Sequence, residues 1–446
     1  MRVLPFRDMS DFDLIIIGGG PAGLTAGLYA ARANMSTILF EAKDIGGELL
    51  NTDLIEDWPG EESITGRALA EKMAAHATKF GLKIQPYSPV KKIRSDGDWK
   101  VVEMEDGTTH RAYAVIVTVG GEPTKLEVPG ETEFHGRGVS YCAVCDGAFF
   151  KGEDLAVVGG GDSAFQEGLF LTRFAKNLSL VHRRNEFRAQ SILQDRLLGM
   201  DNVKAITPAT VKEIGGDTQV RWMDVERDGA VERIPVGGVF VFIGFKPVGR
   251  HLFDEHIDHD ENGYLLTDQY MRTNIPGVYA CGDTRAQLAK QVTTAVGDAT
   301  TAVLHAERYI EELKHMRRSF PDVPSATLER EVERMKIRRF LSGQTIIREG
   351  EPAESFFILT RGAASVRQNG PQGETEISTL KPGDFFGEIG LLSGTVRNAT
   401  VRATAPSEVL ELDAQGFRDL VESSQLTKHR LESKMEQRLA RAGPKT

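Results

Sequence analysis

Short apolar runs that lead into glycine-rich turns dominate the first two thirds of the chain. The run Leu14–Ile17 enters GGGPAG and is followed by LTAGLYAARAN, a pattern typical of a buried strand, a tight turn and a helix. Beyond residue 331 the pattern changes to short strands punctuated by glycine, as in TIIREGEPAESFFILTRGAASVRQNG. The sequence therefore predicts strand–turn–helix units followed by a small β-barrel or jelly roll.

The first glycine-rich turn carries the spacing Gly18-x-Gly20-x-x-Gly23. In this pattern the first glycine allows a tight turn, the second lets the backbone approach a pyrophosphate, and the third lets the helix pack on the strand. A second strand, STILFE, ends in Glu41, where a carboxylate can accept a hydrogen bond from a ribose 2′-hydroxyl. The segment predicts a site for a dinucleotide with an unphosphorylated adenosine ribose, such as FAD.

The same pattern recurs further along the chain. The segment DLAVVGGGDSA places Gly159-x-Gly161-x-x-Ala164 after an apolar strand, and the next strand brings His182 to the offset that Glu41 has in the first copy. The basic residues that follow are Arg183, Arg184 and Arg188. Guanidinium groups bind a 2′-phosphate through paired hydrogen bonds, whereas a carboxylate would repel it. The second unit therefore predicts an NADPH site, and the alternative is a solvated basic turn.

Two of the three cysteines, Cys142 and Cys145, lie in SYCAVCDG just before the second unit. A zinc site needs four ligands, and the one nearby histidine, His135, has no partner at ligand spacing, so no metal is expected. A stable disulfide would be unexpected in the cytoplasm, where thiols are kept reduced. Because the pair lies between a flavin site and an NADPH site, we expect a redox-active disulfide.

Composition narrows the range of partners. The chain has 40% hydrophobic and 26% charged residues, which is ordinary for a globular protein, and its length predicts roughly two to four domains. The formal net charge of -10 gives no electrostatic reason to expect nucleic acid or an anionic membrane as a partner. No apolar run approaches the roughly 18–20 residues of a membrane span, and no export-signal pattern is present. We therefore expect a cytoplasmic protein.

Six segments in a fixed order resemble the low-molecular-weight, bacterial-type thioredoxin reductases over about residues 11–313. They are GGGPAGLTAGLYAARAN, CAVCDG, VVGGGDSA, HRRNEFR, IPGVYACGD and QVTTAVGDATTAVLHAERY. The resemblance implies an α/β flavoprotein disulfide reductase with two dinucleotide-binding domains, of which the NADPH-binding domain is inserted into a discontinuous FAD-binding domain. The expected cofactors are FAD and NADPH, the expected partner is thioredoxin or a thioredoxin-like protein, and the expected assembly is a homodimer.

Residue roles follow from this resemblance. Cys145 is expected to face the flavin, Cys142 to exchange with thioredoxin and Asp146 to donate a proton. The expected FAD contacts are Gly18, Gly20, Pro21, Ala22, Gly23, Glu41, Gly47, Glu48, Asp57, Asp283, Gln291 and Val292. The expected NADPH contacts are Gly159, Gly161, Asp162, Ser163, His182, Arg183, Arg184, Arg188, Ile243 and Gly244. Two positions depart from the family pattern, because Glu48 replaces the usual glutamine and Lys290 the usual arginine. A carboxylate at position 48 is expected to lower the flavin's reduction potential or to change its proton partners.

A second resemblance covers the C-terminal segment, from about residue 329 to residue 439. The stretch DFFGEIGLLSGTVRNATVRA contains FGE, GLL and R-x-A-T in the order of the phosphate-binding cassette of cyclic nucleotide-binding domains. This resemblance implies a β-roll in which Glu388 accepts a ribose 2′-hydroxyl and Arg397 pairs with the cyclic phosphate. The expected cassette residues are Gly387, Glu388, Ile389, Arg397 and Asn398. Asn398 occupies the position at which threonine is associated with a preference for cGMP, so its presence favours cAMP as the ligand. The alternative to a nucleotide-binding domain is a β-roll that serves only as a structural or dimerisation module.

These patterns predict a FAD-binding domain (residues 1–123 and 250–317), an NADPH-binding domain with the CxxC pair (124–249), a linker (318–331) and a cyclic nucleotide-binding domain (332–446). The leading hypothesis is an NADPH-dependent thioredoxin reductase whose activity a cyclic nucleotide modulates. The alternatives are a reductase of another small disulfide protein and a redox-sensing, cyclic nucleotide-binding signalling protein. The last helix is expected to be a lid or a dimer contact, and the lack of a helix-turn-helix pattern disfavours a transcription factor.

Overall fold

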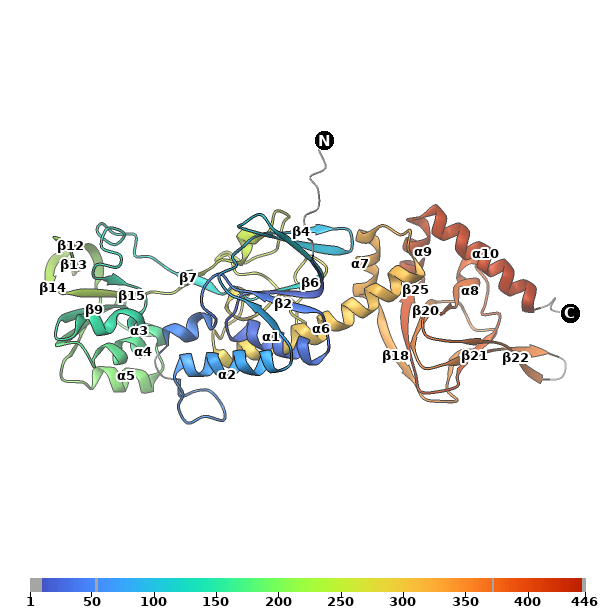
Figure 1. Cartoon of the computed structure of the whole chain (residues 1–446), viewed down its shortest axis with the longest axis horizontal. Helices are drawn as coiled ribbons and strands as arrows, with labels where there is room; N and C mark the ends of the chain where they lie inside the picture. The colour runs from blue at the N-terminus through green and yellow to red at the C-terminus, as the bar shows by residue number, and fades with distance from the viewer. Residues whose placement is uncertain (1–9, 53–54, 371–372, 443–446) are drawn as a thin grey trace, which may run out of the picture.

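The computed structural model describes residues 10–52, 55–370 and 373–442. Residues 1–9 of the predicted FAD-binding domain and residues 443–446 of the predicted cyclic nucleotide-binding domain lie outside the described residues. Figure 1 shows the second dinucleotide unit, the first dinucleotide unit and the C-terminal β-roll in that order along the long axis. Among the described residues, no helix has both the length and the apolar character needed to cross a membrane.

The first dinucleotide unit is built on a mixed sheet with the strand order β3-β2-β1-β6-β5-β4. Its strands are β1 (Ser10–Ile17), β2 (Thr37–Phe40), β3 (Lys83–Gln85), β4 (Val90–Asp96), β5 (Trp99–Met104) and β6 (Thr109–Val117), with α1 (Pro21–Arg32) and α2 (Gly66–Lys79) as helices. The strands β1, β2, β3 and β6 are parallel, as expected for a dinucleotide fold. After the second unit the chain returns to this sheet through β17 (Val278–Ala280), which pairs with the end of β6.

The second unit repeats the parallel arrangement, with the strand order β11-β10-β9-β15-β8. Its parallel strands are β8 (Val139–Ser140), β9 (Asp154–Gly159), β10 (Asn177–Val181), β11 (Val203–Ile206) and β15 (Gly238–Phe242). Its helices are α3 (Ala143–Asp146), α4 (Asp162–Leu171) and α5 (Ser191–Leu198), and its antiparallel meander is β12 (Thr210–Gly216), β13 (Val220–Arg227) and β14 (Ala230–Pro235). The two copies of the glycine pattern therefore fold into two dinucleotide units, as the sequence predicted.

Both connections between the two units pass through one ribbon, β7 (Gly121–Pro123) paired antiparallel with β16 (Phe245–Pro247). An added Cβ at Gly121 would lie 2.5 Å from the carbonyl oxygen of Lys246, so the close pairing requires glycine there. Since the chain leaves and re-enters the first unit through this ribbon, the second unit is an insertion in the first.

The C-terminal unit is a β-roll of two four-stranded antiparallel sheets with the orders β18-β25-β20-β23 and β19-β24-β21-β22. The strands are β18 (Lys336–Phe340), β19 (Thr345–Ile347), β20 (Ser355–Arg361), β21 (Ala364–Gly370), β22 (Gly373–Leu380), β23 (Phe385–Phe386), β24 (Thr400–Ala403) and β25 (Ser407–Asp413). The helices are α8 (Glu388–Ser393), α9 (Ala414–Glu422) and α10 (Gln425–Ala442). This arrangement confirms the predicted jelly-roll-like unit.

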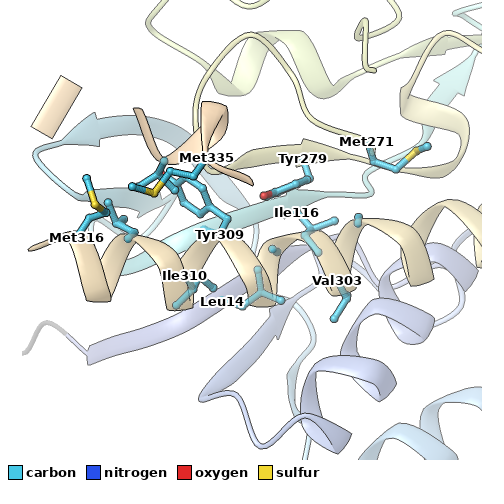
Figure 2. Close-up of a cluster of buried hydrophobic side chains, with 14 of the residues drawn as sticks. Leu14, Ile116, Met271, Tyr279, Val303, Tyr309, Ile310, Met316 and Met335 are labelled. Carbon is cyan, nitrogen blue, oxygen red and sulfur yellow. The ribbon is translucent and has the colours of Figure 1, made fainter. Parts of the chain in front are cut away.

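A single long helix joins the reductase portion to the β-roll. Helix α6 (Val292–Ser319) has 28 residues and is therefore about 42 Å long. The segment predicted as a linker, residues 318–331, overlaps the helix α7 (Ser325–Arg334), whose Leu328 and Val332 are buried. One apolar cluster runs from Leu14 of β1 along α6 to Phe356 of the β-roll, and Figure 2 shows its central part on α6. The β-roll thus shares an apolar core with the first unit and is not joined to it by a flexible linker alone.

Candidate active site

The first glycine-rich turn forms an open cradle at the start of α1. Gly20 precedes the helix and Pro21 is its first residue, so the helix presents its free backbone N–H groups there. An added Cβ at Gly23 would lie 1.8 Å from the carbonyl oxygen of Gly18, so only glycine lets helix and strand approach this closely. At Gly20 the nearest described atom outside its own neighbourhood, the Cα of Gly47, would be 3.9 Å from an added Cβ. The cradle, with Ala22 buried in the first helical turn, fits a dinucleotide pyrophosphate.

Two further expected FAD contacts lie at this cradle. The Glu41 carboxylate accepts hydrogen bonds from the backbone N–H groups of Gly19 (2.6 Å) and Lys43 (2.8 Å), which holds it beside the turn. Gly47 begins the 3₁₀ helix η1 (Gly47–Asn51), and an added Cβ there would lie 3.1 Å from the Cα of Gly20. Asp57, in contrast, is exposed in a separate loop closed by a bridge between residues 55 and 64, and its expected contact stays a prediction.

The segment CGD returns the chain to the same cradle. Gly282 has a φ of +67°, and an added Cβ there would lie 3.2 Å from the Cβ of Ala22. Asp283 follows in the 3₁₀ helix η4 (Gly282–Thr284) and so lies near the start of α1. Burial raises the pKa of the Asp283 carboxyl, and the nearby Lys290 ammonium opposes this shift. Cys281 is a buried free thiol, and burial raises its pKa well above the usual value.

The start of α6 completes this side of the site. Gln291 caps the helix, and Val292, its first residue, packs against the apolar cluster that includes η1. Lys290 donates hydrogen bonds from Nζ to the carbonyl oxygens of Asp283 (3.2 Å) and Arg285 (2.7 Å). The departure from arginine at position 290 therefore leaves a cation that holds the η4 loop in place.

The second glycine-rich turn is also open. Gly161 precedes α4, and no described atom outside its own neighbourhood would lie within 4 Å of an added Cβ. Asp162 begins α4 and accepts a hydrogen bond from the backbone N–H of Gln190 at 2.7 Å, while Ser163 is exposed beside it. The carboxyl ends of the neighbouring strands β9 and β15 bring together Gly159, Ile243 and Gly244. This cradle fits a second dinucleotide.

The basic turn lies against the second cradle. The backbone N–H of Arg188 donates to the carbonyl oxygen of Gly160 at 2.7 Å, and the side chains of Arg183, Arg184 and Arg188 are exposed. The ring of His182 is buried, and an added Cβ at Gly160 would lie 2.4 Å from it. Burial, helped by the adjacent guanidinium groups, lowers the pKa of His182. His182 therefore packs under the turn as a neutral ring, whereas the arginines offer the positive charge.

The cysteine pair lies where the second unit meets the first. Cys142 is half-buried and disulfide-bonded, and its Sγ lies 3.3 Å from Oδ1 of Asn51 in η1. Nδ2 of Asn51 in turn donates a hydrogen bond to Glu48 Oε2 at 3.1 Å. Asp146, the last residue of α3, donates its backbone N–H to the carbonyl oxygen of Cys142 at 3.2 Å. Cys145 also belongs to α3, but its side chain lies outside the described part of the structure.

The expected cyclic nucleotide cassette is assembled in the β-roll. Gly387, with a φ of +88°, precedes α8, and Glu388 begins that helix with 1% exposure. Oε1 of Glu388 pairs with Nη1 of Arg438 on α10 at 2.6 Å, whereas Oε2 has no hydrogen-bond partner within the described part of the chain. Arg397 is 6% exposed, and its Nη1 and Nη2 donate to the carbonyl oxygens of Gly387 (2.8 Å) and Ser355 (2.6 Å).

The side chains of Asn51, Lys434 and Arg438 lie at these sites and were not predicted from the sequence. Arg438 also donates from Nη2 to the carbonyl oxygen of Phe385 at 3.0 Å, and Nζ of Lys434 lies 4.0 Å from the centre of the Phe385 ring. The spacing of Lys434 and Arg438, four residues apart on one helix, was the available signal. The half-buried cassette residues are Ile389 and Asn398. Helix α10 thus lies over the cassette, which favours the lid over the dimer contact.

Comparison with known proteins agrees with these folds. A family model described as pyridine nucleotide-disulphide oxidoreductase matches residues 12–299, and one described as cyclic nucleotide-binding domain matches residues 337–424. The thioredoxin reductase of Listeria innocua is 46% identical over 307 residues, which are 68% of this chain and 95% of the relative. The thioredoxin reductase of Bacillus subtilis is 45% identical over 307 residues, which are 68% of this chain and 96% of the relative.

Solved structures give the same result. The crystal structure of Lactococcus lactis thioredoxin reductase in its FR conformation has a TM-score of 0.66 and 41% identity, and it covers 68% of this chain and 99% of that chain. The thioredoxin reductase of T. acidophilum has a TM-score of 0.64 and 33% identity over 66% of this chain and 97% of that chain. Two dinucleotide folds with a cysteine pair at their junction define the class of pyridine nucleotide-disulphide oxidoreductases. Within that class the chain belongs to the thioredoxin reductase family, and it carries an additional C-terminal cyclic nucleotide-binding domain.

Proposed function

We propose that this oxidoreductase uses NADPH and FAD to reduce the disulfide of thioredoxin or a thioredoxin-like protein, and that a cyclic nucleotide bound in the β-roll modulates its turnover. The observation that carries the reductase assignment is the position of Cys142 at the junction of two open dinucleotide cradles. The same assignment includes a homodimer and a reducing compartment such as the cytoplasm, in which the reduced thiols persist.

The residues of the first cradle and the η4 loop fit FAD, and those of the second cradle fit NADPH. Bound FAD would supply the two-electron transfer that links NADPH to a disulfide. The thiolate of Cys142 then attacks the partner's disulfide, because thiol–disulfide exchange proceeds through the thiolate of an accessible cysteine. Asp146, half-exposed and one helical turn from Cys142, provides a carboxyl group for the accompanying proton transfer.

The polar groups of the cassette match a cyclic nucleotide. The unpartnered Oε2 of Glu388 is a buried acceptor, which is costly unless a donor such as a ribose 2′-hydroxyl reaches it. The guanidinium of Arg397 is buried, and burial lowers its pKa while the nearby Glu388 carboxylate opposes that shift. In the described part of the chain, the hydrogen bonds of the Arg397 guanidinium go to backbone carbonyl oxygens, and its Cζ lies 5.9 Å from the centre of the Phe357 ring. A buried cation with neutral hydrogen-bond partners gains most from an anion, so a cyclic phosphate would complete its coordination.

Helix α6 provides a physical route between the two sites. Its first residue lies at the FAD cradle, and Phe320, which follows its last turn, contacts Phe356 and Phe385 with ring centres 5.6 Å and 6.2 Å apart. Phe385 lies in β23, directly before the cassette residues Phe386, Gly387 and Glu388. A nucleotide that shifts β23 and α8 would therefore move the aromatic rings against which the end of α6 packs. Such coupling is expected to be about 1–2 kcal/mol, or a several-fold change in turnover.

The dithiol is tested with Cys142→Ser and Cys145→Ser. Each variant should bind FAD and lose NADPH-dependent reduction of thioredoxin, and the double variant should be no worse than either single variant because the cysteines act as one unit. Near wild-type turnover in either variant would contradict the assignment. Measuring kcat/KM for thioredoxin beside a glutaredoxin-like protein separates the proposed substrate from another small disulfide protein.

The nucleotide site is tested by calorimetric titration with cAMP and cGMP. Arg397→Ala should abolish binding, whereas Arg402→Ala, which removes a half-exposed arginine of the same β-roll that pairs with Glu374, should leave binding intact. Binding that survives in Arg397→Ala would mean that the cassette is not the site, and no binding to the wild type would make the β-roll a structural module.

A further inference from the structure

The interface between the two dinucleotide units contains a chain of three polar side chains, Glu48, Asn51 and Cys142. One of them, Glu48, departs from the family pattern. Glu48 and Asn51 lie one turn apart in η1 of the first unit, and Asn51 reaches across to Cys142 in the second unit. An ion pair between Arg196 of α5 and Glu56 (2.5 Å) closes the same interface nearby. The contact therefore belongs to the domain arrangement in which the cysteine pair lies against the first unit.

The carboxylate of Glu48 determines which way the Asn51 amide faces. An ionised carboxylate can only accept hydrogen bonds, so Nδ2 of Asn51 points to Glu48 and Oδ1 is left to face the Cys142 sulfur. A glutamine at position 48, the residue usual in the family pattern, has both a donor and an acceptor and would allow either orientation of Asn51. The departure at position 48 thus fixes a carbonyl oxygen against the cysteine.

A carbonyl oxygen discriminates between the two protonation states of the cysteine. It accepts a hydrogen bond from a thiol S–H, but its negative end repels a thiolate. The contact of 3.3 Å joins Asn51 Oδ1 to the disulfide-bonded sulfur of Cys142, and the same placement in the reduced enzyme favours the protonated form of Cys142. The charged groups around Glu48 are Asp283 of η4 and Lys43. Desolvation, with a smaller contribution from Asp283, raises the pKa of Glu48, and the hydrogen bond from Asn51 and the charge of Lys43 oppose that shift.

We propose that Asn51, oriented by Glu48, is a positioning residue that keeps Cys142 in its thiol form while the cysteine pair lies against the first unit. Movement of the second unit away from η1 breaks the contact, so Cys142 becomes more acidic and a larger fraction of it is the thiolate that reacts with the partner protein. No electron transfer is involved, and the proton that leaves Cys142 goes to solvent or to Asp146. The inference rests on the proposed role of Cys142 as the exchanging thiol.

The test measures the apparent pKa of Cys142 without turnover. In a FAD-loaded Cys145→Ser background, the rate of alkylation of Cys142 by iodoacetamide is followed against pH, with the modified site assigned by mass spectrometry. Asn51→Ala and Glu48→Gln should each lower the apparent pKa by about one unit. The combination of both should be no lower than Asn51→Ala alone, because Glu48 acts through Asn51. Asn51→Asp places a carboxylate against the sulfur and should shift the apparent pKa upward.

Glu61→Gln is the matched control, since Glu61 pairs with Lys72 on the surface of the same unit and its loss should leave the profile unchanged. An unchanged profile in both Asn51 variants would overturn the inference. Additive shifts from Glu48→Gln and Asn51→Ala would also overturn it, because they would mean that Glu48 acts by charge alone. Since alkylation needs no thioredoxin, failure here is distinguishable from failure of the reductase assignment, which the turnover of Cys142→Ser decides.

Discussion

The junction between the reductase and the β-roll contains a buried ion pair, and breaking it should lower the free energy of unfolding by a predictable amount. Nζ of Lys100 in β5 lies 2.7 Å from Oε1 of Glu329 in α7, and their side chains are 1% and 7% exposed. Tyr309 of α6 donates a second hydrogen bond to the same carboxylate oxygen at 3.3 Å. Lys100→Met would leave the Glu329 carboxylate buried without its cation. Breaking a buried pair in this way costs about 3–5 kcal/mol.

The cost should depend on pH in a definite direction. Burial raises the pKa of Glu329 even with Lys100 present, and without Lys100 the shift becomes larger. A carboxyl whose pKa is raised on folding favours the folded state when it is protonated, so the variant loses stability as pH rises above the ordinary glutamate value of about 4.3. The deficit of Lys100→Met against the wild type should therefore be smaller at pH 5.5 than at pH 8.

Differential scanning calorimetry of the holoenzyme at these two pH values is the assay. A loss of this size lowers the transition that includes α6, α7 and the β-roll by on the order of 10 °C. Lys91→Met is the matched control, because Lys91 pairs with Glu103 at 2.7 Å with exposed side chains, and exposed pairs contribute at most about 1 kcal/mol. The double variant Lys100→Met/Glu329→Leu should recover most of the loss. If Lys100→Met is no more destabilising than Lys91→Met, the shared junction is not a tightly packed core.

Three further predictions concern cofactor choice, the lid and pH. Replacing both Arg183 and Arg184 by alanine should raise KM for NADPH on the order of tenfold or more and leave KM for NADH nearly unchanged. The reason is that each charge-assisted contact to the 2′-phosphate is worth about 1.5–3 kcal/mol. Equal effects on the KM values of both cofactors would mean that the two arginines support only the fold. Arg438→Ala should weaken cyclic nucleotide binding several-fold in calorimetry, because Glu388 loses the cation that orients it. An unchanged affinity would contradict the role of α10 as a lid over the cassette. Burial raises the pKa of Glu312 on α6 to about 7, so its stabilising contribution is present below about 4.5 and is lost as pH rises through 7. Glu312→Gln should remove up to about 3 kcal/mol of this pH dependence in thermal unfolding, and an identical pH profile would refute the assignment.

Much of the fold was predictable because its signals are local. The spacing of Gly18, Gly20 and Gly23 is itself the structural requirement of the turn, and the same holds for Gly159 and Gly161. The cassette was predictable for a similar reason, because Gly387, Glu388 and Arg397 lie within a short segment. The sequence distance between Gly159 and His182 correctly predicted that His182 lies at the turn. It did not predict the position of the His182 ring, which packs under Gly160.

The remaining features depend on contacts between residues far apart in the chain. The prolines near residue 320 correctly indicated a break after α6, but the burial of α7 depends on Lys100, a residue of a distant strand. Asn51 is polar and unremarkable in the sequence until the second unit brings Cys142 against it. Arg438 acquires its role only because α10 folds back over α8. Sequence patterns identified these segments, and tertiary packing supplied their partners.

The most direct test of control by the β-roll measures thioredoxin-dependent NADPH oxidation by the purified holoenzyme while cAMP and cGMP are titrated. We predict a several-fold change in turnover that is half-maximal at the nucleotide's calorimetric dissociation constant. This response should disappear in Arg397→Ala and persist in Arg402→Ala. Unchanged turnover and unchanged NADPH affinity at concentrations that saturate the β-roll with either nucleotide would contradict the claim that this domain controls the reductase.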